Sequence, residues 1–208
     1  MADTESGAGS VRPLPGEASG PVAGEVSGDV PDGAPESPAE ERTARDTVYR
    51  LLATRARSRA ELLRALRRKG VATDTAETVL DRFAAAGLVD DAAFAAEWVR
   101  GRHRQRGLGR GALREELRDK GIDEDTAAEA LESVDTDAEV ERARELVRRR
   151  ARGMTAVDAR TRTRRLLGLL ARKGYGRALA FRVVREELES TGVQASAPDE
   201  ELWFEPDD

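Results

Sequence analysis

A Lys-Gly pair occurs three times at the end of similar leucine-rich segments, and this repetition constrains the fold more than any other feature of the sequence. The segments are ELLRALRRKGV (61–71), ALREELRDKGI (112–122) and RLLGLLARKGY (165–175). Within each segment, leucines spaced four residues apart lie on one face of a helix. The spacing between the segments, about fifty residues, predicts a tandem repeat of helical units.

The glycines of these pairs are expected to end helices. Each follows a basic residue at the end of an apolar-periodic stretch, which is the position where a left-handed backbone favours glycine. A new helix start follows each turn within a few residues. The three glycines are Gly70, Gly121 and Gly174, and the new starts are Thr73, Asp123 and Gly176. Each unit is therefore predicted to contain a helix, a tight turn and a second helix, preceded by a third helix.

The periodicity predicts an all-α fold of three tandem three-helix repeats. The expected helices are 45–55, 58–69 and 73–86, then 90–106, 109–120 and 123–133, then 137–151, 155–173 and 176–189, with Thr155 as the cap of the eighth. No stretch alternates with period two, so no sheet is expected. Because units of about fifty residues are too small to bury a full core alone, we expect neighbouring repeats to stack into an elongated curved arc.

The charge is divided unevenly along the chain. The net charge is −5 overall, but it is −7 over residues 1–44, +8 over 45–190 and −6 over 191–208. The first segment is rich in Gly, Pro and Ser and is predicted to be disordered. The repeats are expected at 45–88, 89–134 and 135–190. The acidic tail 191–208 carries Trp203 and Phe204; it either solubilises the protein or folds back onto the basic body.

The composition excludes several kinds of site and location. The chain has no cysteine and one histidine, His103, so neither a metal site nor a cofactor is expected. The adjacent Asp90 and Asp91 are interpreted as a helix N-terminus rather than as a catalytic pair. No apolar run is long enough to span a membrane, and the N-terminus lacks a secretory signal. A non-enzymatic, cytoplasmic protein is expected.

Four segments carry a resemblance to a known family. They are SRAELLRALRRKGV (58–71), GLVDDAAFAAEWVRGR (87–102), GRGALREELRDKGI (109–122) and LLARKGY (169–175). Together they resemble the RecX family of bacterial recombinase regulators, in the expected order over 45–190; the long acidic N-terminal extension departs from the family's short form. The resemblance implies a monomer that binds the RecA recombinase filament and its single-stranded or filament-bound DNA. It also implies that the protein mainly inhibits RecA's recombinase and ATPase activity, and so affects DNA repair, recombination and the SOS response.

Arginines that do not recur between the repeats are the candidate contacts with such a filament. Repeated leucines mark what the fold needs, whereas unrepeated charge is a better candidate for binding a partner. The segment 100–110 contains several basic side chains and no acid, so we expect it to face no acid; the alternative is a solvated face of salt bridges. The candidates are Arg100, Arg102, Arg104, Arg106, Arg110, Arg114, Arg118, Arg148 and Arg149.

Two other functions are compatible with the pattern. A helix-turn-helix repressor would insert the helix after each turn into the DNA major groove. The helices 73–86 and 123–133 argue against this, because they are acidic. A helical adaptor without nucleic-acid contact is the second alternative. Trp98, four residues after Phe94, is expected in the core, with base stacking as the less favoured role.

Overall fold

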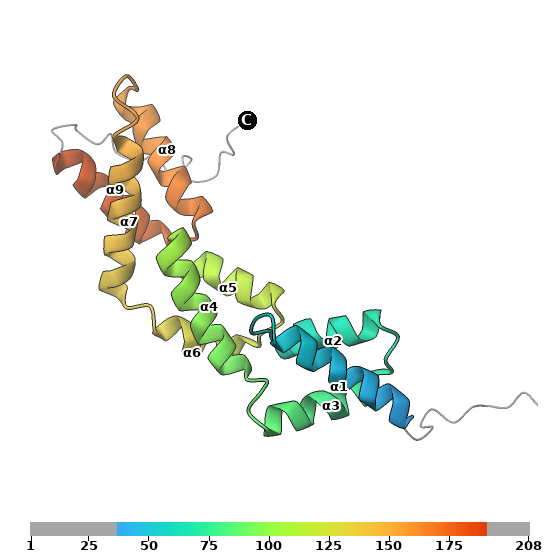
Figure 1. Ribbon diagram of the computed structural model, residues 1–208. Helices are drawn as coiled ribbons and strands as arrows, with labels where there is room; N and C mark the ends of the chain where they lie inside the picture. Colours follow the sequence, from blue (N-terminus) through green and yellow to red (C-terminus); the bar gives the residue numbers. More distant parts are fainter. Residues whose placement is uncertain (1–36, 191–208) are drawn as a thin grey trace, which may run out of the picture. The chain divides into compact units, whose positions relative to one another are not determined.

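The computed structural model describes residues 37–190, and within this range the chain forms nine helices and no strand (Figure 1). The helices are α1 (Pro38–Leu52), α2 (Arg59–Arg68), α3 (Thr73–Ala85), α4 (Asp91–Arg106), α5 (Arg110–Asp119), α6 (Glu124–Glu132), α7 (Thr136–Ala151), α8 (Ala159–Arg172) and α9 (Arg177–Ser190). They form three successive three-helix repeats, so the all-α tandem-repeat fold is confirmed. The curved arc stays a prediction.

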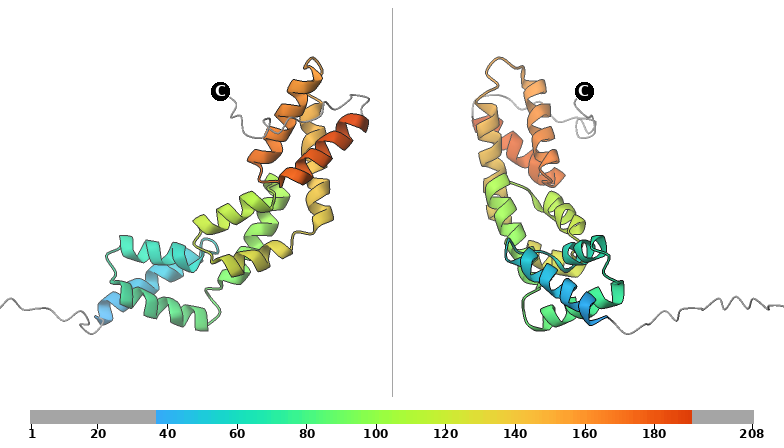
Figure 2. Two further views of the ribbon diagram at one scale, coloured as in Figure 1. Left: turned by 180° about the vertical axis from the view of Figure 1, so that it is seen from behind. Right: turned by 45° about the vertical axis from the view of Figure 1, so that its right-hand side comes forward.

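Each repeat encloses its own apolar core. The aligned leucines are fully buried: Leu62 and Leu66 in the first repeat, Leu113 and Leu117 in the second, and Leu166 and Leu170 in the third. The buried residues form three separate clusters, one for each of the three-helix bundles (Figure 2). The leucines therefore stabilise the repeat to which they belong. The expectation that a unit of about fifty residues is too small to bury a core alone is wrong.

Helix α1 begins seven residues earlier than the sequence predicted. Pro38 occupies its first turn, where a missing N–H costs nothing. Glu40 Oε1 accepts a hydrogen bond from the backbone N–H of Ala72 at 2.5 Å, and Glu41 forms an ion pair with Arg82. These contacts with the start and last turn of α3 hold a polar segment in a helix, so the prediction of disorder over 1–44 is wrong for residues 38–44. Residues 1–36 and the tail 191–208 lie outside the described range.

Helix α8 begins four residues later than predicted. Its cap is Asp158, whose side chain accepts a hydrogen bond from the N–H of Thr161 at 2.9 Å, and not Thr155. Arg162 reaches back from the first turn of α8 and donates to the carbonyl of Met154 at 2.7 Å. Met154 is buried in the core of the third repeat. Met154 therefore anchors the loop 152–158, most of whose other residues are exposed.

The three Lys-Gly turns adopt the predicted conformation. The φ angles of Gly70, Gly121 and Gly174 are +80°, +76° and +78°. In each turn the residue after glycine donates its N–H to the carbonyl of a leucine five residues earlier, as from Tyr175 to Leu170 at 3.0 Å. This hydrogen bond completes a Schellman motif and satisfies an otherwise unpaired carbonyl of the helix end.

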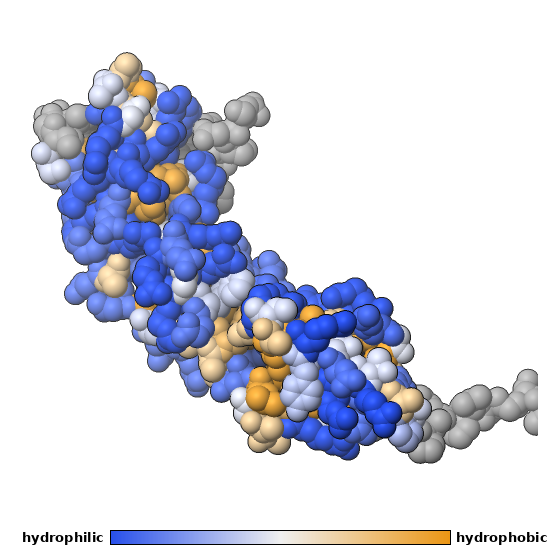
Figure 3. Space-filling model, viewed as in Figure 1, coloured by the Kyte–Doolittle hydropathy of each residue, from blue (hydrophilic) through white to orange (hydrophobic). Residues whose placement is uncertain are grey.

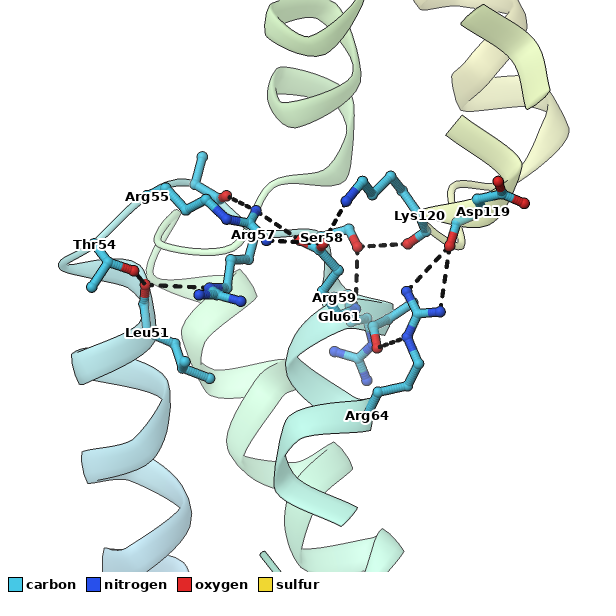
Figure 4. Close-up of polar contacts among 12 residues, drawn as sticks. Leu51, Thr54, Arg55, Arg57, Ser58, Arg59, Glu61, Arg64, Asp119 and Lys120 are labelled. Carbon is cyan, nitrogen blue, oxygen red and sulfur yellow. Dashed lines mark hydrogen bonds and ion pairs between the residues drawn. The ribbon is translucent and has the colours of Figure 1, made fainter. Parts of the chain in front are cut away.

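The second and third of these turns also join the repeats. The turn after α5 lies against the start of α2, where the hydroxyl of Ser58 donates to the carbonyl of Lys120 at 2.6 Å (Figure 4). The same hydroxyl accepts from the N–H of Glu61 at 3.2 Å. The N–H of Arg59 donates to Asp91, the first residue of α4, at 2.8 Å. The N-terminus of α2 is therefore capped partly by its own serine and partly by the second repeat.

The junction between the second and third repeats uses the same arrangement. The N–H groups of Gly109 and Gly111 donate to the carbonyls of Lys173 and Gly174 at 2.8 and 2.9 Å. The N–H of Arg110 donates to a carboxylate oxygen of the buried Glu139, in the first turns of α7, at 3.0 Å. In both junctions, unpaired amides at the start of a middle helix find acceptors in the next repeat.

The lysine of each docked turn adds a polar contact with the preceding repeat. Lys120 Nζ donates to Glu61 Oε1 at 2.7 Å, and Arg55 donates to both oxygens of this carboxylate with hydrogen bonds of 3.0 Å. Lys173 Nζ donates to the carbonyl of Arg106 at 2.8 Å. The joints between repeats are therefore held by polar groups with defined directions.

Two glycine substitutions separate the cost of the left-handed backbone from the cost of disrupting a junction. A Cβ on Gly174 would lie 2.1 Å from the backbone nitrogen of Ala112, whereas a Cβ on Gly70 would have no atom within 4 Å. We expect Gly70→Ala to lower the free energy of unfolding by about 1 kcal/mol through backbone strain alone. Gly174→Ala should cost roughly 2 kcal/mol more. Urea unfolding followed by circular dichroism measures both.

Hydrogen exchange provides a local check on the same pair. Gly174→Ala should accelerate exchange at the amides of Gly109 and Gly111, because their acceptors must move. Gly70→Ala should leave both amides protected. Equal destabilisation by the two substitutions, or unchanged exchange in Gly174→Ala, would contradict the proposed role of this turn in the junction.

Acid should weaken the first junction through Glu61. Burial alone would raise the pKa of Glu61, but hydrogen bonds from Arg55 and Lys120 outweigh it and lower the pKa to about 2. Because the folded-state pKa lies below the ordinary value of 4.5, the carboxylate stabilises the fold above that pH and loses this effect as the pH falls toward 2. At pH 6 the free energy of unfolding of wild type should exceed that of Glu61→Gln by on the order of 2 kcal/mol. The difference should shrink at pH 3; a pH-independent difference would show that the charge of Glu61 is immaterial.

Candidate protein and nucleic-acid interface

Helix α4 directs some of its arginines into the fold. The guanidinium of Arg102 lies 4.1 Å from the ring centroid of Trp98, and Lys120 Nζ lies 4.6 Å from it. The Trp98 Nε1–H donates to Glu116 at 2.7 Å, and the ring stacks on Phe94 at a centroid distance of 5.6 Å. Phe94 belongs to the core as expected, and Trp98 packs against it while only partly buried. The ring of Trp98 is engaged by Phe94 and two cations, which disfavours base stacking.

The expectation that the segment 100–110 faces no acid is wrong. Arg102 and Arg106 are four residues apart, and both approach Glu116, at 3.0 and 3.8 Å. Arg100 pairs with Glu97 of its own helix at 2.7 Å. The prediction considered only the residues of the segment itself. It missed Glu116 because that residue approaches α4 only when α5 folds back along α4.

Arg110 is likewise neutralised, by a residue of the following repeat. Its Nε lies 3.7 Å from the buried carboxylate of Glu139, and another guanidinium nitrogen donates to the carbonyl of Val134. The Nε itself is buried without a hydrogen-bond acceptor. Arg110 therefore joins the second and third repeats, a role that an unrepeated charge did not predict.

The remaining candidates lie at the surface in two groups. Arg114 and Arg148 are half-exposed and paired, with Glu124 at 3.0 Å and Glu187 at 2.7 Å. The hydrogen bond that Arg148 donates to Glu187 raises the pKa of Arg148, which keeps that side chain charged. Surface pairs of this kind are weak and exchange readily for another anion. The other group has no carboxylate of residues 37–190 within ion-pair distance and consists of Arg104, Arg118 and Arg149.

A groove between the second and third repeats brings predicted and unpredicted arginines together. It has a volume of about 770 Å³ and runs between α5 and the turn that joins α8 to α9. Two of its arginines, Arg110 and Arg114, are among the sequence candidates. Arg172 and Arg177 were missed, because nothing in their local sequence places them opposite α5. Glu115 also lines the groove, so its charge is mixed but predominantly basic.

The other polar residues singled out from the sequence have structural roles. The side chain of Asp90 caps α4 by accepting from the N–H of Ala93 at 2.8 Å, as predicted. Asp91 instead caps α2, and burial raises its pKa despite the hydrogen bond from Arg59. His103 Nδ1 lies 2.8 Å from the carbonyl oxygen of Leu108, within the turn that ends α4.

Clustered metal ligands and membrane-spanning helices were sought among residues 37–190. No group of three or more His, Cys, Asp and Glu side chains within residues 37–190 is arranged to hold a metal ion. None of the helices in that range is both long and apolar enough to cross a bilayer. Most of the face seen in Figure 3 is hydrophilic, with small apolar patches over the first and third repeats. On this face, the surface open to a partner is therefore mainly hydrophilic.

Comparison with known proteins matches the three repeats one by one. Residues 44–83 match the first three-helix domain of RecX, residues 90–131 the second and residues 137–184 the third. Among solved structures, the crystal structure of RecX from Lactobacillus salivarius superposes with a TM-score of 0.68 at 20% identity. It covers 72% of this chain and 97% of that one. A second crystal structure, of a regulatory protein RecX, gives a TM-score of 0.65 at 24% identity over 71% of this chain and 72% of that one. These structures support the fold.

Relatives of higher identity extend the match over most of the chain. The protein named Regulatory protein RecX of Amycolatopsis mediterranei (strain U-32) is 49% identical over 167 residues, which are 79% of this chain and 95% of the relative. The protein of the same name from Thermobifida fusca (strain YX) is 48% identical over 158 residues, which are 76% of this chain and 85% of the relative. With three matching domains in order and identities of this size, the chain belongs to the RecX family of regulatory proteins.

Proposed function

We propose that this protein binds the RecA recombinase and the RecA–DNA filament and mainly inhibits RecA's recombinase and ATPase activity. Membership of a family of regulatory proteins supports a regulatory role. The observation that carries the choice of a polyanionic partner is the set of three exposed arginines, Arg104, Arg118 and Arg149. They lie on three different helices, and none of them forms an ion pair with a carboxylate of residues 37–190. Fixed and unpaired charge of one sign attracts a partner of the opposite sign.

The mechanism requires binding and no chemistry. A protein that binds one state of a filament better than another shifts the population toward that state. Arginines neutralise the phosphates of filament-bound DNA, and released counterions add a favourable, salt-dependent term. A monomer acting in the cytoplasm without a cofactor is sufficient for this mechanism.

The helix-turn-helix repressor remains the less favoured alternative. The helices that follow the first two Lys-Gly turns are α3 and α6, and both are acidic. In α6 the acids are Glu124, Asp125, Glu129 and Glu132, with no base. In α3 the one base, Arg82, is paired with Glu41. Such helices would be repelled by the phosphates that flank a major groove. A helical adaptor would bind neither DNA nor filaments with salt-dependent affinity.

The function is tested by RecA ATPase and strand-exchange assays on single-stranded DNA. Protein added at less than one molecule per RecA should lower both rates, because a filament is affected beyond the subunit that is bound. Unchanged rates at equimolar protein would remove the proposal. Sequence-specific binding to duplex DNA, without an effect on RecA, would instead favour the repressor.

Charge reversal tests whether the exposed arginines make the contact. The variant Arg104→Glu/Arg118→Glu should bind the filament at least about tenfold more weakly at low salt, and each lost phosphate contact should flatten the log–log salt dependence by roughly 0.7. Arg102 is left intact because it packs on Trp98. The control Arg42→Glu/Arg50→Glu makes the same charge change at exposed positions of α1. Equal weakening by both variants would show that net charge, and not this surface, sets the affinity.

A further inference from the structure

The middle helices of the three repeats, α2, α5 and α8, follow one another end to end. The carbonyl of Lys120, at the end of α5, accepts a hydrogen bond from the hydroxyl of Ser58 at the start of α2 at 2.6 Å. The carbonyl of Lys173, at the end of α8, accepts from the N–H of Gly109 at the start of α5 at 2.8 Å. The three helices therefore form a row, which can be followed from α8 through α5 to α2 in Figure 1.

The exposed surface of this row carries arginines from all three repeats. In α2, Leu62 and Leu66 are buried, whereas three arginines of the same helix are exposed. In α5, two exposed arginines are four residues apart, so they lie on one face of the helix. The last residue of α8 is also an exposed arginine. We call these side chains the arginine track; its members are Arg64, Arg67, Arg68, Arg114, Arg118 and Arg172.

Contacts at the two junctions connect the members of the arginine track. Arg172 and Arg114 line the same groove, of about 770 Å³, between the end of α8 and α5. Arg118 lies one turn beyond Arg114 on the same face of α5. The guanidinium of Arg64 donates two hydrogen bonds of 3.3 Å to the carbonyl of Asp119, the residue after Arg118 (Figure 4). The other two arginines of α2 lie one turn further along that helix, so the track passes from the third repeat to the first.

Most arginines of the track keep their charge available. Arg64 donates to carbonyl oxygens of the backbone, which leave its positive charge uncompensated. Arg67 and Arg68, at the end of α2, form no ion pair with a carboxylate of residues 37–190. The same holds for Arg118 within that range. Arg114 pairs with Glu124 at 3.0 Å, but the two side chains are 50% and 68% exposed, and such a pair exchanges readily for another anion.

The acids close to the track are fewer than its arginines. Besides Glu124, Glu115 lines the groove and Asp119 is exposed at the end of α5. Glu139 also lines the groove, but it is held by Arg110, which lies outside the track. The track therefore has an excess of positive charge, distributed along a row of helices rather than gathered in one pocket.

We propose that the arginine track binds the phosphodiester backbone of a nucleic acid. A nucleic-acid strand presents negative charges at regular intervals, and guanidinium groups bind phosphate oxygens with paired hydrogen bonds. The helices of the row contain no aromatic residue, so the contact involves the backbone rather than stacked bases and does not depend on base sequence. On the basis of the proposed function, the strand belongs to the DNA of the RecA filament. The track extends that contact to α2, none of whose arginines the sequence singled out.

The affinity of the full chain for fluorescein-labelled oligothymidylate, measured by anisotropy without RecA, tests the track. Arg67→Glu/Arg68→Glu should raise the Kd at least about tenfold at low salt and flatten the log–log salt dependence by roughly 0.7 for each lost phosphate contact. The control Arg42→Glu/Arg50→Glu makes the same charge change in the same repeat, at exposed positions of α1 outside the row, and should weaken binding much less. Equal weakening by both variants, no weakening by the first, or no binding by wild type would overturn the proposal.

A neutral pair of substitutions separates lost contacts from a weakened helix. Arg67 and Arg68 lie in the last turn of α2, where a glutamate interacts unfavourably with the helix dipole. Arg67→Gln/Arg68→Gln removes the positive charges without adding negative ones, and it should also flatten the salt dependence while circular dichroism stays as in wild type. Weaker binding that is accompanied by lost helicity in both variants would assign the two arginines a structural role and overturn the proposal.

Measurements with RecA and with duplex DNA separate the track from the proposed function and identify the source of the phosphates. Arg67→Glu/Arg68→Glu should bind DNA-free RecA as wild type does. Lost binding to RecA with unchanged binding to oligothymidylate would assign these arginines to an acidic protein surface and overturn the track. If wild type bound oligothymidylate through the track but left RecA's ATPase rate unchanged, the proposed function would fail and the track would stand. A parallel titration with duplex DNA of the same length shows whether a single strand or a duplex binds the track more tightly.

Discussion

The first backbone amides of each middle helix need hydrogen-bond acceptors, and the junctions between repeats depend on this requirement. A helix leaves its first N–H groups without partners in its own backbone, and each buried donor needs an acceptor elsewhere. In α2 and α5 a carboxylate in the first turns of the next repeat's first helix accepts from one of these amides. The Lys-Gly turn of the next repeat accepts from two further amides at the start of α5 and from the capping hydroxyl of Ser58 at the start of α2. Because these hydrogen bonds are directional, they fix the contact between repeats more narrowly than apolar packing would.

This arrangement also explains why the two ends of the series differ from its middle. Among residues 37–190 no repeat precedes the first Lys-Gly turn, and a Cβ on Gly70 would have no atom within 4 Å. At the other end, α8 is longer than α2 and α5, and its own Asp158 caps it. The terminal units of a repeat protein commonly depart from the internal pattern in this way. Each repeat keeps its own apolar core, so the polar joints carry the connection between cores.

The arginines form two groups, those whose charge is paired within the fold and those whose charge is not. Arg102 and Arg110 have their charge satisfied inside the fold, by Glu116 and Glu139. Arg104, Arg118 and Arg149 have no such acid among the described residues. A charge that the fold does not use is available to a partner, so the second group supports the proposed contact with a filament.

The sequence by itself determined the all-α fold, the three repeats and the ends of most helices. Leucine periodicity and left-handed glycines are local properties, and a period of four or a glycine at C′ is visible without the rest of the chain. Only the tertiary structure decided the start of α1, because its polar first turns are held by Ala72 and Arg82 of a distant helix. Only the tertiary structure decided which arginines remain unpaired. Glu116 and Glu139 reach Arg102 and Arg110 only through the packing of helices, so the spacing of residues along the sequence does not predict these ion pairs.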